Sequence, residues 1–387
     1  MVETFFASCP RGLEPLLTED LRAAGAADPR QTAGGVHFAG EWAVCYRANL
    51  HSRIATRILW RVGQAAYVRE EDIYRLALET PWPQWFVPEQ TIRVDVNAVK
   101  SPLRSIDFVT LRIKDAICDR FRRDFGRRPS VDTRQPDVRV QGFINSDQCT
   151  LYLDTSGAPL YQRGFRQKTV DAPLKENLAA GILRLSGWQP GMALLDPMCG
   201  SGTFLLEAAQ VALARAPGAR RDFAFENLRD FDRATWQGML DAARATEKPA
   251  APATIFGSDR SPVAVRSALA NLDRAGLLPA VSLASGDVLE VAAPATQGIM
   301  VSNPPYGERV SSDDELAAFY PLLGHALKRR FAGWNCYLIS ADTRLPKLVR
   351  LTPSKKTPLF NGALECRLYE FRMVAGSNRG KTGQGSD

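Results

Sequence analysis

The feature that most constrains the fold of this chain is a short apolar strand that runs into a glycine-rich turn and then a helix. Residues 193–195 are apolar, as in a strand buried within a parallel sheet. Gly200 and Gly202 follow, and they permit backbone angles and a close ligand approach that a Cβ would block. Residues 203–214 then have the composition of a helix. The pattern predicts a strand–turn–helix unit whose free backbone N–H groups can meet a ligand.

Two well-known nucleotide-binding loops fit this turn poorly. A phosphate-binding P-loop needs Gly-Lys-Ser or Gly-Lys-Thr, and the turn contains no lysine. A dinucleotide-binding fingerprint needs a third small residue where Leu205 stands. Taken alone, a Gly-x-Gly turn could also be an ordinary junction between a strand and a helix that binds nothing.

Three further strands follow in the order expected of a doubly wound α/β fold. Residues 254–259 end at Asp259, residues 281–287 end at Asp287, and a strand at 298–302 leads to Asn303. The carboxyl ends of parallel strands lie at one sheet edge, so these polar groups should line one ligand site. An acid in the position of Asp259 suits hydrogen bonds to ribose hydroxyls, and the carboxylate of Asp287 could accept from an adenine amino group.

The turn, the two acids and the loop after the fourth strand form a characteristic series. Its members are Asp196-Pro197-Met198-Cys199-Gly200-Ser201-Gly202-Thr203, Asp259, Asp287 and Asn303-Pro304-Pro305-Tyr306. The series resembles motifs I to IV of the class I methyltransferases that depend on S-adenosylmethionine (SAM), and Asn-Pro-Pro-Tyr is the form found in the branch that methylates amino groups. The resemblance implies a SAM site made of Asp196, Pro197, Cys199, Gly200, Ser201, Gly202, Thr203, Asp259, Asp287 and Asn303.

Five other stretches extend the resemblance over nearly the whole chain. They are residues 5–14, 34–38, 161–166, 172–176 and 303–309. With them the chain resembles the THUMP-domain RNA guanine-N2 methyltransferases, above all the N-terminal half of the bacterial 23S rRNA enzyme. Many members of that family continue into a second methyltransferase half. This sequence holds one half, so we expect the guanine-N2 activity alone.

The resemblance assigns catalysis to Asn303, Pro304, Pro305 and Tyr306. The exocyclic amine of guanine is a poor nucleophile because its lone pair is delocalised into the ring. Asn303 Oδ1 and the Pro304 carbonyl can each accept one N–H of that amine and aim its lone pair at the methyl group. The two prolines stiffen the loop, and Tyr306 can stack on a flipped or unpaired base.

Several alternatives stay open. The Asn-Pro-Pro-Tyr loop also serves adenine-N6 methyltransferases, tRNA guanine-N2 methyltransferases share both domains, and a proline-rich turn can occur without catalysis. A non-catalytic RNA-binding assembly factor could keep the same fold, although intact Asp196, Asp259 and Asn303 favour an enzyme. The details of residues 5–38 and 303–309 favour 23S rRNA over tRNA. Neither the target nucleotide nor the oligomeric state is indicated, and a monomer is our expectation.

Length and composition fit a protein of two or three domains in a reducing cytoplasm. The chain has 387 residues, of which 45% are hydrophobic and 24% charged. It contains neither an apolar run of membrane-spanning length nor a signal-peptide pattern. Seven scattered cysteines without Cys-x-x-Cys and only three histidines argue against disulfides and against a metal site. Cys199 is expected to be a small residue that fits a tight turn.

The positive charge is concentrated in one region. The net charge is +7, and eleven basic residues against six acids leave +5 between Lys100 and Arg139. The excess of arginine favours phosphate contact, although a solvated helix face is the simpler alternative. The expected RNA-binding residues are Arg112, Lys114, Arg120, Arg122, Arg123, Arg127, Arg128, Arg163 and Arg166.

The N-terminal part divides into two segments. Residues 1–65 alternate strands and helices in the manner of a ferredoxin-like α+β domain. Residues 66–158 resemble the THUMP RNA-binding module. Within them the sequence predicts a basic helix at 106–125 and a hairpin of strands at 138–145 and 149–154.

The remainder is predicted to be catalytic. Residues 159–374 should form a Rossmann-like methyltransferase domain, with a mostly parallel seven-stranded sheet and a terminal antiparallel hairpin turning at Asn361-Gly362. A polar interval at 217–252 interrupts this domain as an insertion. Residues 375–387 have no apolar content to bury, so we expect a disordered tail.

Overall fold

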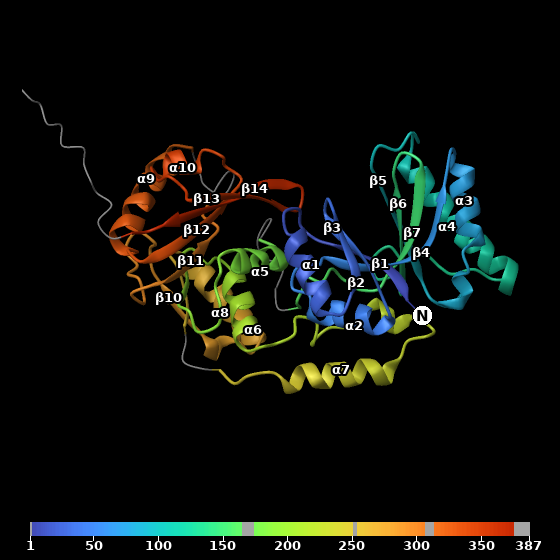
Figure 1. Ribbon diagram of the computed structural model, residues 1–387, viewed down its shortest axis with the longest axis horizontal. Coiled ribbons are helices and arrows are strands. Elements are labelled where there is room, and N and C mark those ends of the chain that lie inside the picture. The colour runs from blue at the N-terminus through green and yellow to red at the C-terminus, as the bar shows by residue number, and fades with distance from the viewer. Residues whose placement is uncertain (1, 165–173, 251–253, 306–312, 375–387) are drawn as a thin grey trace, which may run out of the picture. The chain divides into compact units, whose positions relative to one another are not determined.

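The computed structural model describes residues 2–164, 174–250, 254–305 and 313–374 (Figure 1). The chain forms two compact units. Unit 1 takes the chain up to Gly164 together with Ala216–Thr246, and unit 2 takes the rest. The predicted tail at 375–387 lies outside the described residues.

Unit 1 is built on one continuous sheet of seven strands in the order β2-β3-β1-β4-β7-β6-β5. Strand β4 pairs with β1 on one side and with β7 on the other, both antiparallel, so it joins the two predicted N-terminal segments into one sheet. The β6–β7 hairpin is antiparallel, as predicted. The strands are β1 (Glu3–Ser8), β2 (Ala27–Thr32), β3 (Gly35–Gly40), β4 (Arg57–Ala66), β5 (Ile92–Ala98), β6 (Val138–Ile144) and β7 (Gln148–Asp154).

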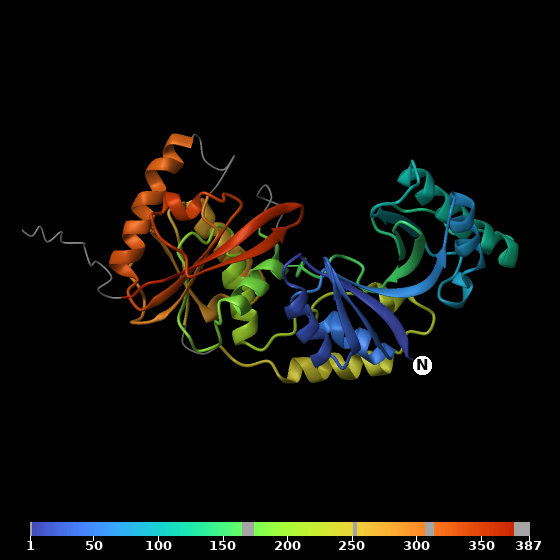
Figure 2. The same ribbon diagram turned by 45° about the horizontal axis from the view of Figure 1, so that its top comes forward.

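The helices of unit 1 cover one face of this sheet and lie on its outer, convex side (Figure 2). They are α1 (Glu14–Ala23), α2 (Trp42–His51), α3 (Glu70–Glu79), the short η1 (Trp82–Gln84) and α4 (Ile106–Phe125). Trp60 of β4 packs against Trp42 of α2, with ring centroids 4.9 Å apart. A Cβ at Gly63 would lie 3.5 Å from Leu76 of α3, and one at Gly142 of β6 would lie 3.2 Å from Ile113 of α4. Strand register puts Trp60, Gly63 and Gly142 on the same face.

Most of the polar insertion belongs to unit 1, although the residues that precede and follow it in sequence belong to unit 2. It contains η2 (Ala224–Asn227) and α7 (Arg233–Ala245). Phe225 and Trp236 pack their rings on Tyr46 of α2, with centroids 4.7 Å and 6.1 Å away. The Arg229 amide donates to the Trp85 carbonyl over 2.9 Å. The segment predicted as catalytic at 159–374 therefore contributes its residues 159–164 and 216–246 to unit 1.

Unit 2 has the predicted Rossmann-like sheet, in the order β10-β9-β8-β11-β12-β14-β13. The first five strands are parallel, and β14 runs antiparallel to both β12 and β13. Gly362, in the turn of the terminal hairpin, has a φ of +69°. The strands are β8 (Leu194–Asp196), β9 (Ile255–Asp259), β10 (Val281–Ser285), β11 (Gly298–Ser302), β12 (Trp334–Ser340), β13 (Lys355–Asn361) and β14 (Leu364–Arg372).

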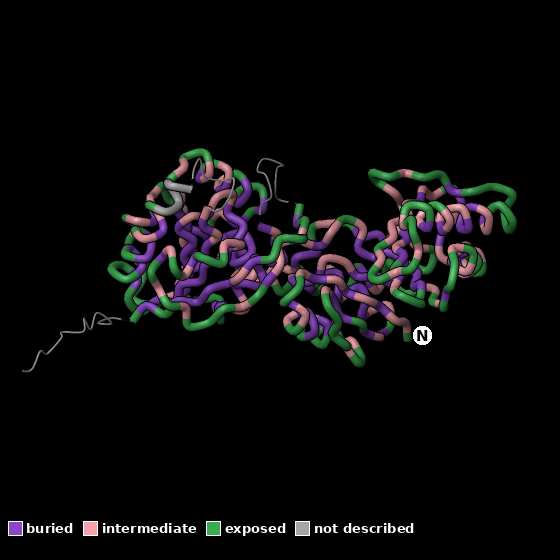
Figure 3. The backbone as a smooth tube through the Cα atoms, turned by 90° about the horizontal axis from the view of Figure 1, so that it is seen from above, coloured by how far each residue is buried: buried purple, intermediate pink, exposed green. Residues whose placement is uncertain are grey.

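Buried apolar strands form the core of unit 2, as the purple segments of Figure 3 show. Met300, Cys336 and Leu338 are fully buried, as expected for strands covered on both faces. The helices are α5 (Glu176–Leu185), α6 (Thr203–Ala212), α8 (Pro262–Arg274), η3 (Leu278–Ala280), α9 (Asp313–Arg330) and α10 (Leu345–Leu348). No helix in the described part of the chain is long and apolar enough to cross a membrane.

Candidate active site

The glycine-rich turn joins β8 to α6 at the carboxyl edge of the unit 2 sheet. Gly200 and Gly202 have φ of +54° and +83°, the left-handed region that favours glycine. A Cβ on Gly202 would lie 3.2 Å from Ala268 of α8, whereas one on Gly200 would have no atom of the described residues within 4 Å. The turn is therefore packed closely at Gly202 and open at Gly200, where a ligand could approach the backbone.

Asp196 ends β8 and is buried beneath the turn, with an exposed fraction of 2%. Its Oδ1 accepts a hydrogen bond from Ser302 Oγ over 2.8 Å and one from the Met198 amide over 3.3 Å. Burial raises the pKa of this carboxyl to about 7, and the charge of Asp259 acts in the same direction. Asp196 thus ties the turn to the end of β11.

Asp259 ends β9 and holds the turn from the other side. Its Oδ2 accepts from the Gly200 amide and its Oδ1 from the Ser261 amide, both over 2.9 Å. Each carboxylate oxygen keeps a further lone pair for a ligand hydroxyl. Asp259 therefore lies beside the turn, at the position from which it was predicted to reach a ribose.

Asp287 lies two residues beyond the end of β10 and is half-buried. Its Oδ1 accepts from the Leu289 amide over 2.9 Å. The neighbouring Gly286 amide donates to the Asp259 carbonyl over 3.1 Å, which holds this loop against the end of β9. The structure therefore brings Asp196, Asp259 and Asp287 to one edge of the sheet, as predicted.

The loop after β11 presents an unpaired acceptor. Asn303 is half-buried, and its Oδ1 is buried without a hydrogen-bond partner among the described residues. A buried acceptor left unpaired costs about 1–3 kcal/mol, so a bound donor would relieve a real penalty. Pro304 is buried and Pro305 is half-buried. Tyr306, the fourth predicted catalytic residue, lies outside the described residues.

Two residues that the sequence did not single out support the site. Tyr320 of α9 is buried, and its hydroxyl donates to the Pro305 carbonyl over 2.8 Å. Asn271 of α8 donates from Nδ2 to the Ser201 carbonyl over 3.0 Å. Asn271 lies on the same helical stripe as the buried Ala268 and Leu272. The sequence signal that could have identified Asn271 is an amide side chain on the buried side of a helix.

Comparison with known families agrees with this geometry. Residues 163–370 match the family model described as RMKL-like, methyltransferase domain. The chain belongs to this family. Residues 67–154 match the THUMP domain, and residues 4–59 match the RlmL ferredoxin-like domain. The RMKL-like methyltransferase domain thus follows the two N-terminal modules in the predicted order.

Individual relatives of this RMKL-like chain cover nearly all of it. It is 38% identical to the ribosomal RNA large subunit methyltransferase K/L of Shewanella frigidimarina, over 97% of this chain and 53% of that protein. It is 36% identical to "Putative RNA methyltransferase slr0064" of Synechocystis, over 95% of this chain and 96% of the relative. The crystal structure of SMU.472 complexed with SAH superposes with a TM-score of 0.87 at 29% identity, covering 96% of this chain and 98% of that one. The chain spans about half the length of the curated K/L relatives it matches.

Cys199 lies within the turn as a buried thiol. Burial raises its pKa, and the charges of Asp196 and Asp259 add to the effect. A thiol held protonated in this way is a poor nucleophile, so its small size accounts for its place in the turn. Within the described residues, no three His, Cys, Asp or Glu side chains are grouped so as to hold a metal ion.

The predicted RNA-binding side chains on α4 all have carboxylate partners in this RMKL-like chain. The pairs are Arg112–Glu71, Lys114–Asp115, Arg120–Asp124, Arg122–Asp119 and Arg123–Asp124, at 2.5–3.1 Å. Arg127, beyond the helix, pairs with Glu89. The side chains of Arg122, Arg123 and Arg127 are more than half exposed, so phosphates could still reach them.

The other two predicted RNA contacts lie elsewhere. Arg163 has an exposed fraction of only 4%, and it donates to the carbonyls of Arg53 and Leu160. In the structure Arg163 therefore fixes the segment around residue 160 to the segment around residue 53. Arg166 lies outside the described residues.

Proposed function

We propose that this chain transfers a methyl group from SAM to the exocyclic N2 amine of a guanosine in RNA, with 23S rRNA as the favoured substrate. The observation that carries the proposal is the buried Oδ1 of Asn303, an acceptor without a partner at the carboxyl edge of the sheet. The K/L relatives, whose names give a ribosomal RNA substrate, support the choice of RNA. Within the proposal the chain acts as a cytoplasmic monomer.

The residues of the turn fit SAM. Gly200 leaves open space beside its backbone, and Asp259 has lone pairs free for ribose hydroxyls. The structural relative SMU.472 was solved with SAH, the product that remains after SAM gives up its methyl group. When SAM is bound, its sulfonium supplies an electrophilic methyl group that needs no activation by an acid or a metal ion.

The chain's own part in the reaction is to hold and orient the amine. Asn303 Oδ1 and the Pro304 carbonyl would each accept one N–H, which directs the nitrogen lone pair toward the methyl group. Both hydrogen bonds strengthen as positive charge develops on the nitrogen, so they stabilise the transition state more than the ground state. The Tyr320 hydroxyl holds the Pro305 carbonyl and thereby fixes the loop.

We also propose that α4 and the residues after it contact RNA, but only through their exposed arginines. Arg122, Arg123 and Arg127 are the exposed candidates, and Arg128 follows them in the chain. Exposed ion pairs contribute little to stability, so phosphates can displace their carboxylates at low cost. Arg112 and Arg120, which are less exposed, would keep their intramolecular partners.

Methylation with isotope-labelled SAM tests the proposal. The purified chain is incubated with 23S rRNA, with tRNA and with an adenine-rich RNA, and the products are digested to nucleosides for mass spectrometry. We expect N2-methylguanosine in 23S rRNA. N2-methylguanosine in tRNA alone would reassign the substrate, and N6-methyladenosine would overturn the base assignment. SAM binding without methylation of any RNA would favour an assembly factor.

A further inference from the structure

The sheet of unit 1 has a second face that its helices leave uncovered. The contacts of Trp60, Gly63 and Gly142 place the helices on one side, and side chains alternate along each strand. The opposite side, here called the open face, carries Phe6, His37, Arg61, Arg139, Phe143 and Tyr152. It runs across both N-terminal modules because β4 pairs with a strand of each. Figure 2 shows it as the inner side of the curved sheet.

Aromatic rings form a group on the open face. The half-buried Phe6 ring lies 4.8 Å from the exposed His37 ring and 6.3 Å from the ring of Tyr152, measured between centroids, and Tyr152 is itself buried at 5% exposure. Phe143 of β6 is 39% exposed, so its ring is accessible to a partner. Burial, and then the charge of Arg61, lower the pKa of His37 and so disfavour its charged imidazolium form. The open face thus offers the exposed rings of His37 and Phe143 to a planar partner.

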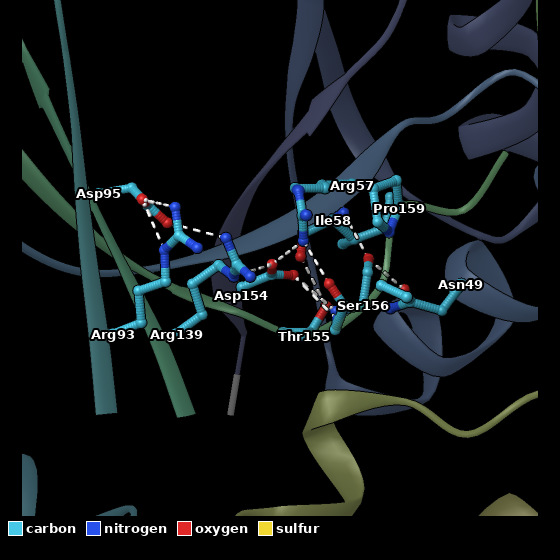
Figure 4. Close-up of polar contacts among 12 residues, drawn as sticks. Asn49, Arg57, Ile58, Arg93, Asp95, Arg139, Asp154, Thr155, Ser156 and Pro159 are labelled. Atoms are coloured by element: carbon cyan, nitrogen blue, oxygen red, sulfur yellow. Dashed lines mark hydrogen bonds and ion pairs between the residues drawn. The ribbon is translucent and has the colours of Figure 1, made fainter. Parts of the chain in front are cut away.

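The charges on the open face favour an anion. A ladder of Arg93, Asp95, Arg139, Asp154 and Arg57 crosses the sheet from β5 to β4 (Figure 4). With the exposed Arg61, the five strands β1, β4, β5, β6 and β7 project four arginines and two carboxylates to this side, which leaves a charge of +2. Arg139 lies 2.8 Å from Asp95 and 3.9 Å from Asp154, so the ladder holds its arginines in place.

We propose that the open face binds an unpaired RNA segment, whose bases stack on the exposed rings and whose phosphates meet the arginines. The inference rests on the proposed function, because an RNA substrate supplies the segment. Bases in unpaired RNA are free to stack on aromatic side chains, whereas a duplex hides them. A protein partner fits less well, since the exposed apolar area is confined to single rings between charged and amide side chains such as Arg61 and Gln141.

Two matched variants of the full chain test the surface. The open-face variant is Arg61→Ala with Phe143→Leu, which removes one charge and one ring but keeps an apolar side chain. The control is Arg75→Ala with Phe108→Leu, which makes the same changes on the helix-covered side. Arg75 has a side-chain exposure of 60% and Phe108 is 49% exposed, so neither change opens the core. Thermal unfolding of both variants should match the parent.

The probe is a fluorescein-labelled oligouridylate of about 12 nucleotides, a length within the usual range for single-strand binding surfaces. Loss of one stacked base should weaken binding by about tenfold or more in the open-face variant, while the control stays within about twofold. Phe143→Tyr, which keeps the ring, should retain the affinity of the parent. A duplex of the same length should not distinguish the variants.

Equal oligouridylate affinity in the open-face variant and the control would overturn the inference, as would a loss in Phe143→Tyr equal to that in Phe143→Leu. These results can be distinguished from a failure of the proposed function. If the chain methylates 23S rRNA but its open face does not contribute to RNA binding, the proposed function stands and the open-face inference is wrong. If the open face binds oligouridylate but no RNA is methylated, the open-face inference stands and the proposed function is wrong.

Discussion

The Ser302 hydroxyl donates a hydrogen bond to the Asp196 carboxylate over 2.8 Å, although the two residues are 106 positions apart in the chain. Ser302 is the last residue of β11, and Asn303 follows it directly. Asp196 begins the glycine-rich turn. The bond therefore links the proposed SAM turn to the proposed catalytic loop through two buried side chains. A displacement of the turn should therefore also displace the loop.

Asp259→Ala should weaken SAM binding by about 1–3 kcal/mol, because the carboxylate would contact the ribose and also holds the Gly200 amide. Asp259→Asn keeps one acceptor oxygen and should lose less. Isothermal titration calorimetry measures both variants. Unchanged affinity in Asp259→Ala would remove Asp259 from the SAM site.

Asn303→Ala should reduce single-turnover methylation by about two to three powers of ten while SAM and RNA affinities hold, because its Oδ1 would act mainly in the transition state. Asn303→Asp retains an acceptor at the same position and should keep more activity. A rate within a few-fold of the parent in Asn303→Ala would exclude the proposed role.

Tyr320→Phe should lower turnover by up to about tenfold, because the loop loses the hydroxyl that holds the Pro305 carbonyl. The matched control is Tyr369→Phe, which removes another hydroxyl that contacts a backbone carbonyl, that of Thr343. Single-turnover rates at saturating SAM compare the two. If both variants lose activity equally, the effect is one of general stability and not of loop position.

Asp196 should make stability depend on pH. Its folded pKa of about 7 exceeds the ordinary value of 3.8, so the unfolded chain releases the proton first as pH rises. The resulting penalty is absent below about pH 4, grows as pH rises and is complete above about pH 7. Asp196→Asn imitates the protonated form. Thermal unfolding from pH 4 to 8 should show a smaller decline in the variant than in the parent, and parallel declines would contradict the shift.

Strands β8, β9, β10 and β11 of unit 2 could be predicted from the sequence because each leads into a polar residue at its carboxyl end, whereas β12 was not singled out. The prediction for β11 matched the structure at both ends, and the hairpin turn at Asn361-Gly362 followed from its dipeptide. Strand β2 (Ala27–Thr32) was missed. Its residues are exposed or half-buried at the edge of the sheet, so no apolar alternation marks it.

Contacts between distant segments could not be predicted in the same way. The insertion at 216–246 packs on Tyr46, far away in sequence, and only the three-dimensional fold shows which unit it joins. The same holds for Tyr320, whose hydroxyl reaches the catalytic loop from α9. The same limit applies to the charges of α4, because its basic residues pair with carboxylates whose positions the sequence does not give.

Arg122, Arg123, Arg127 and Arg128 provide the last prediction. If they bind phosphates, replacing all four with alanine should weaken RNA binding and flatten its dependence on salt, each lost contact reducing the log–log slope by about 0.7–0.9. SAM affinity should not change, because these residues lie in unit 1 and the turn lies in unit 2. Filter binding to 23S rRNA across salt concentrations measures the slope. If the carboxylates keep these arginines occupied, the quadruple variant will retain the slope of the parent, and the phosphate contacts must then come from other arginines, such as those of the open face.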